Sequence, residues 1–66
     1  MRNKALSNLY ATLDEVLFYE NIEKPHYYDM LLKNLAKLSK RVKQSDVDPD
    51  LWNTIQRVLT NDQQEG

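Results

Sequence analysis

The sequence predicts an all-α protein: an antiparallel helical hairpin of residues 3–19 and 25–43, followed by a shorter third helix at residues 49–60, all packed as a three-helix bundle. Two observations carry this prediction. In each segment, large apolar residues recur at spacings of three and four, which places them on one side of a helix. The connections between segments are short, so successive helices are expected to be antiparallel neighbours in a single domain of residues 1–66.

The first predicted helix, residues 3–19, has an apolar stripe that covers about one third of its circumference. The stripe comprises Leu6, Leu9, Tyr10, Leu13, Val16 and Leu17. Asn3 is predicted to cap the first turn, because its short side chain can accept a hydrogen bond from an unpaired backbone N–H. Phe18 departs from the pattern and is predicted to point outward.

The second predicted helix begins at Pro25, since proline disfavours a helical residue before it and fits the first turn of a helix. Its stripe occupies heptad a and d positions and comprises Tyr28, Leu31, Leu35, Leu38 and Val42. Four basic residues lie away from this stripe: Lys33, Lys37 and Lys40 nearly opposite Leu35, and Arg41 toward one flank. We interpret these four residues, the basic face, as the solvated side of the helix.

The third predicted helix begins after Asp48, which can cap it, with Pro49 at the first helical position. Its stripe comprises Leu51, Trp52, Ile55, Val58 and Leu59. The helix is predicted to end near residue 60, and the polar residues 61–66 are predicted to fray.

Three aspartates precede and open this helix, in the D-x-D-x-D pattern that begins a calcium loop. The sixth position of such a loop requires glycine and the twelfth requires glutamate, but these positions hold Leu51 and Arg57. We therefore interpret the aspartates as a helix start. Residues 25–44 carry five positive and one negative charge, and residues 45–66 carry the reverse, so the two segments are expected to neutralise each other.

Composition excludes several classes of protein. The 66 residues contain no cysteine, which rules out disulfides and thiolate zinc sites and favours a cytoplasmic setting. No stretch approaches the roughly 20 apolar residues that cross a bilayer, so we expect a soluble protein without a membrane anchor.

The sequence also shows no recognisable set of catalytic residues. The single histidine, His26, has Glu23 and Asp29 one turn away, a poor ligand set for zinc. The one glycine is the last residue, so no glycine loop can hold phosphate. We predict no metal, no cofactor and no enzymatic activity.

Partner binding is the function that these features favour. A chain of this length buries only about 60% of its unfolded surface, so an isolated monomer is expected to be marginally stable and to gain from self-association as a homodimer. Aromatic and methionine side chains are enriched in the centres of interfaces. The candidates are Phe18, Tyr19, Tyr27 and Met30, at the edges of the two long stripes. The alternative is that these side chains only cover the hairpin or pack on the third helix.

Nucleic-acid binding is the second hypothesis, through Lys33, Lys37, Lys40 and Arg41. The net charge of −1 and the aspartates at the start of the third helix oppose it, because phosphate would repel them. A protein-binding regulator or inhibitor is therefore the preferred prediction.

A weak resemblance supplies a third hypothesis. The order LY, PHYYDMLLKNLAKLSKR and DPDLWNTIQRVL is loosely similar to the helical-bundle immunity proteins that protect bacteria from their own class IIa bacteriocins. The similarity is mostly one of leucine spacing, and those proteins generally have a further C-terminal helix that these segments do not include. The resemblance implies an inhibitory binding role.

Overall fold

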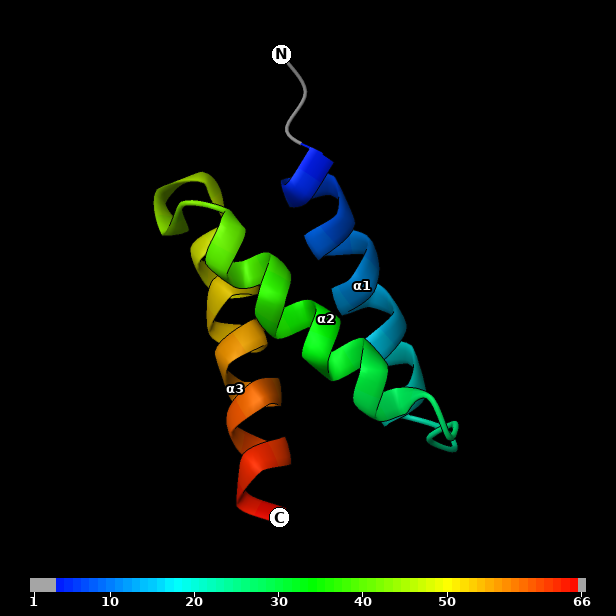
Figure 1. Cartoon of the computed structure of the whole chain (residues 1–66). Helices are drawn as coiled ribbons and strands as arrows, with labels where there is room; N and C mark the ends of the chain where they lie inside the picture. Colours follow the sequence, from blue (N-terminus) through cyan, green and yellow to red (C-terminus); the bar gives the residue numbers. More distant parts are fainter. Residues whose placement is uncertain (1–3, 66) are drawn as a thin grey trace.

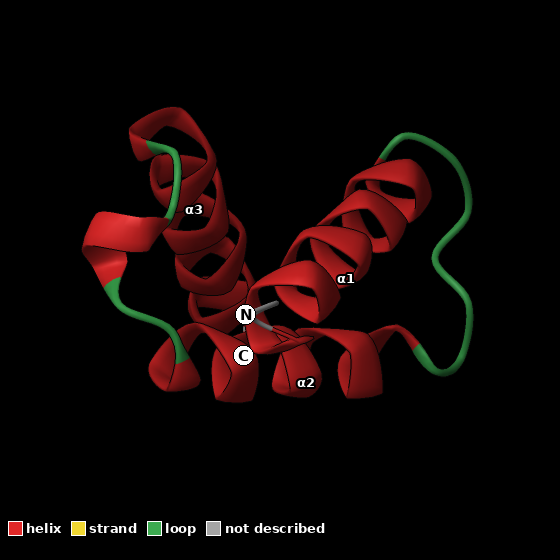
Figure 2. Ribbon diagram, turned by 90° about the horizontal axis from the view of Figure 1, so that it is seen from above, coloured by secondary structure: helices red, strands yellow, loops and turns green. Residues whose placement is uncertain are grey.

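The structure is a computed structural model that describes residues 4–65. It contains three α-helices, α1 (Lys4–Glu20), α2 (Tyr28–Arg41) and α3 (Pro49–Glu65), with one 3-10 turn, η1 (Gln44–Asp46), before α3. The chain descends in α1, returns in α2 and descends again in α3 (Figure 1). Viewed from above, α1 and α3 lie on the same side of α2 and diverge from it (Figure 2). The prediction of an all-α three-helix protein is confirmed.

The core lies where the apolar stripes of the helices meet. It comprises Leu9, Leu13 and Val16 from α1, Tyr28, Leu32, Leu35 and Leu38 from α2, Val42 and Val47 from the second connection, and Ile55 and Val58 from α3. Leu35 is 0% exposed, so the predicted centre of the α2 stripe is confirmed. Leu32 is more deeply buried than Leu31, which is half-buried.

Two polar contacts define the register of the α1–α2 hairpin. The hydroxyls of Tyr19 and Tyr27 lie 2.6 Å apart, and Asn34 Nδ2 donates to Thr12 Oγ1 over 3.4 Å. In both pairs the residue numbers add to the same value, so one step forward along α1 matches one step back along α2. The two helices therefore keep a constant antiparallel register between these contacts.

The second helix is shorter than the predicted 25–43. Pro25 does not open α2, because residues 25–28 form a turn in which the Tyr28 N–H donates to the Pro25 carbonyl over 3.0 Å. At the other end, Val42 is extended, with φ −106° and ψ 156°. This conformation ends the helix at Arg41 and allows the Val42 side chain to be buried in the core. The predicted cap at Asn3 lies outside the described residues.

The start of α3 is as predicted. Asp48 Oδ1 accepts a hydrogen bond of 2.9 Å from the Asp50 N–H, and Pro49 is the first helical residue. The Asp48 N–H also lies 3.4 Å from the Tyr10 hydroxyl, which connects this start to α1. The predicted end at residue 60 is wrong, because the helix continues to Glu65. Fraying of residues 61–66 in solution stays a prediction.

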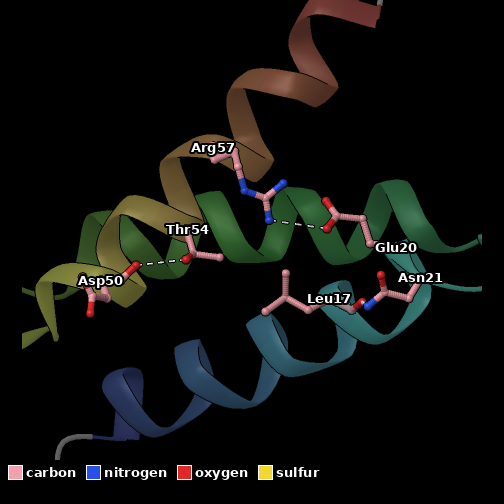
Figure 3. A network of polar contacts seen from close by, with 6 residues as sticks. All are labelled: Leu17, Glu20, Asn21, Asp50, Thr54 and Arg57. Carbon is pink, nitrogen blue, oxygen red and sulfur yellow. Dashed lines mark hydrogen bonds and ion pairs between the residues drawn. The ribbon is translucent and has the colours of Figure 1, made fainter.

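The observed ion pair joins α3 to α1, whereas the sequence predicted neutralisation between the end of α2 and the start of α3. Among the residues described, one ion pair forms, between Arg57 of α3 and Glu20 of α1, over 3.5 Å (Figure 3). The expected neutralisation between the end of α2 and the start of α3 includes no direct ion pair within residues 4–61. Both partners of the observed pair are partly exposed to water, so it contributes about 0–1 kcal/mol.

None of the helices within residues 4–65 combines the length and the apolar content that a bilayer-crossing segment requires.

Candidate functional site

The largest exposed apolar side chains lie around the connection between α1 and α2. Met30 is 71% exposed, Phe18 60%, Ile22 55% and Tyr27 37%. We call these four residues, together with Tyr19, the hairpin patch. Phe18 follows the buried Val16 by two residues, about 200° around α1, so the helical period turns it away from the core as predicted.

The two tyrosines hold the centre of the patch in place. Their rings pack edge to face with centroids 5.8 Å apart, in addition to the hydrogen bond between their hydroxyls. The Phe18 ring packs edge to face on Tyr19 at 5.3 Å, and the His26 ring packs on Tyr27 at 5.4 Å. Tyr19 is half-buried against the core. Tyr19 and Tyr27 thus cover the end of the hairpin, while Phe18 and Met30 extend beyond it into solvent.

The hydrogen bond has an electrostatic consequence. Ionisation of the Tyr27 phenol would remove this hydrogen bond, which raises the pKa of Tyr27 above its ordinary value. Partial desolvation and the negative charge of nearby Glu15 raise this pKa further. Glu15 is exposed on α1 about one helical turn before Phe18 and Tyr19. The patch is therefore bordered by a negative charge on α1.

Ile22 was missed by the sequence-based prediction. It lies two residues after the end of α1, and its N–H donates to the Tyr19 carbonyl over 3.3 Å, so the turn is fixed to the helix end. The signal was present in the sequence, because a lone isoleucine between Asn21 and Glu23 interrupts an otherwise polar connection. An exposed isoleucine beside exposed aromatic residues extends the apolar surface.

The basic face lies next to the hairpin patch on α2. Lys33, Lys37, Lys40 and Arg41 are all exposed, and none forms an ion pair with a carboxylate among the side chains that the structure describes. A shallow groove joins the two surfaces, with a volume of about 410 Å³. Its lining residues are Met30, Leu31, Lys33, Asn34 and Lys37. The exposed methionine therefore has a cationic border on α2.

Other concave surfaces flank Trp52, which is half-buried. One depression of about 520 Å³ lies between this ring and the second connection, where Gln44, Ser45 and Asn53 contribute polar groups. Another, of about 340 Å³, lies between α2 and α3 beside Lys40. Neither contains a cluster of titratable groups that would indicate chemistry.

The described residues also show how the possible metal ligands are arranged. Within the described part of the chain, no three histidine or acidic side chains come close enough together to hold a metal ion. The His26 ring packs edge to face against Tyr27.

Comparison with protein-family models, curated proteins and solved structures finds no match to this chain. The similarity to bacteriocin immunity proteins stays a prediction.

Proposed function

We propose that this chain is a small, non-catalytic protein-binding module that acts in the cytoplasm as a regulator or inhibitor of a larger protein, which it contacts through the hairpin patch. One observation carries the proposal: three large apolar side chains, each more than half exposed, lie within residues 18–30. Exposed apolar residues scattered singly are ordinary, but several of them at one end of a helical hairpin, bordered by charges, are typical of a binding surface.

The rigidity of the patch supports the same function. Binding costs free energy when flexible side chains become ordered. Here the ring contacts of Tyr19 with Phe18 and Tyr27, and the hydrogen bond between the tyrosines, restrain the aromatic side chains before a partner arrives. Less ordering is then required on binding.

Substitution of Met30 tests the proposal. We expect the wild-type chain, used as bait in its native cytoplasm, to capture one protein reproducibly. Met30→Glu should reduce that capture at least about tenfold, because a charge would replace an apolar contact at the interface centre. Capture is measured by quantitative mass spectrometry of the bound fraction.

Asn53→Glu is the matched control, because Asn53 is exposed on α3, away from the patch. It introduces the same charge and should leave capture unchanged. Circular dichroism should show wild-type helicity for both variants, since both positions are exposed. Equal capture by wild type and Met30→Glu would contradict the proposal.

A second candidate function is nucleic-acid binding, favoured by the four cations of the basic face that have no carboxylate partner within the described residues. If these cations contact four phosphates, affinity for duplex DNA should fall roughly 100-fold between about 50 and 200 mM salt, because counterion release depends on the number of contacts. Fluorescence anisotropy of labelled DNA measures this dependence. No binding at the lower salt concentration would eliminate this function.

A further inference from the structure

We propose that the hairpin patch binds a second copy of this chain, in a two-fold symmetric dimer in which α1 of each copy lies across α2 of the other. This inference rests on the proposed function, since both require the patch to be a binding surface. A larger protein that binds the patch would then compete with the dimer.

The charges of the two helices determine which arrangement is possible. A two-fold interface brings the same surface of both copies together, so that surface has to be complementary to itself. Within its described range α1 carries three carboxylates and one lysine, whereas α2 carries four basic side chains and one aspartate. Placing α1 on α1 and α2 on α2 would oppose like charges. Placing α1 on α2 pairs opposite charges twice, once on each side of the axis.

The hairpin register then indicates which side chains meet. A two-fold axis parallel to the helices leaves every residue at its own level along the bundle. The Thr12–Asn34 and Tyr19–Tyr27 contacts place Glu15 level with Leu31, one turn or less from Met30 and Lys33. Glu15 and Lys33 are both exposed and have no ion-pair partner within residues 4–61. Glu15 of one copy therefore comes within reach of Lys33 of the other.

The apolar part of the patch lies beside these charges. Phe18 and Met30 are the two most exposed large apolar side chains among the described residues, and they flank the junction of α1 and α2 from opposite helices. Crossing α1 over α2 covers both with apolar surface from the second copy. An apolar centre with a charged rim is the usual composition of a protein interface. Burial of this kind also adds stability to a short helical chain without disulfides.

Charge reversal tests the pairing. Sedimentation equilibrium of the purified full chain at low salt should show a monomer–dimer equilibrium. Glu15→Lys alone and Lys33→Glu alone should each weaken the dimer at least about tenfold, because each opposes like charges across the interface. The double variant should recover most of the wild-type affinity, since the pair is restored with its signs exchanged.

Circular dichroism of the three variants separates loss of association from loss of folding. Both positions are exposed, so helicity should stay at the wild-type level. A wild-type chain that is monomeric at the highest concentration measured would overturn the dimer. A double variant no tighter than either single variant would overturn the proposed arrangement.

Failure of this inference is distinct from failure of the proposed function. A monomeric chain that still captures a larger protein through Met30 overturns the dimer and leaves the proposed function intact. A charge-dependent dimer that captures no larger protein overturns the proposed function and leaves the dimer intact.

Discussion

Replacing Leu35 by alanine is expected to lower the free energy of unfolding by about 2–5 kcal/mol. Leu35 is fully buried at the middle of α2, between the apolar residues of α1 and α3. Alanine would lose the transfer free energy of the removed carbon atoms and leave a cavity that the surrounding helices can only partly close. Because folded domains are stable by roughly 5–15 kcal/mol and short chains have the least reserve, a substantial fraction of the variant should be unfolded.

Urea denaturation followed by circular dichroism measures this loss. Lys37→Ala is the matched control, because Lys37 is exposed on the same helix and its substitution should change the free energy of unfolding by no more than about 0.5 kcal/mol. The measurement is best made at one fixed protein concentration, since self-association would add to the apparent stability. A Leu35→Ala variant as stable as Lys37→Ala would show that the three helices do not share this core.

Replacing Val47 by aspartate is expected to cost at least about 3 kcal/mol, because it buries a carboxylate without a partner. Val47 lies in the connection between α2 and α3, yet its side chain is only 4% exposed. Its backbone is extended, and its N–H donates to the Gln44 carbonyl over 3.1 Å, which holds the side chain toward the core. The new carboxylate would displace the start of α3 from α1 and α2.

Ser45→Asp is the matched control for this prediction. Ser45 belongs to the same connection but is exposed, so the same carboxylate should remain in water there. Urea denaturation of the two variants compares them directly. If Val47→Asp unfolds at the same urea concentration as Ser45→Asp, the second connection is not part of the core.

Val47 also shows a limit of predicting burial from the helical period of apolar residues. The helical period identifies apolar residues that share a face within one helix, and it correctly selected Leu9, Leu35 and Ile55. It has no meaning in a connection, where the direction of a side chain depends on the local backbone. Val47 lies between two aspartates in the sequence, and its burial follows from the extended backbone after η1.

The candidate site also combines features that the sequence predicts with features that depend on tertiary structure. The period of α1 was sufficient to predict that Phe18 points outward, since it follows Val16 by two residues. It was not sufficient to predict that Tyr19 and Tyr27 share a hydrogen bond, because that contact depends on how two helices are aligned. Whether Phe18 and Met30 bind a partner depends on surfaces outside this chain.

Local chemistry in the sequence therefore determined the three helices, the capped start of α3 at Asp48 and the outward direction of the basic face. Each of these depends on residues within a few positions of one another. Tertiary structure decided the hydrogen bond between Tyr19 and Tyr27 and the pairing of Arg57 with Glu20. The physical reason is that each of these contacts is worth little by itself and forms only where the packing of the helices brings its two partners together.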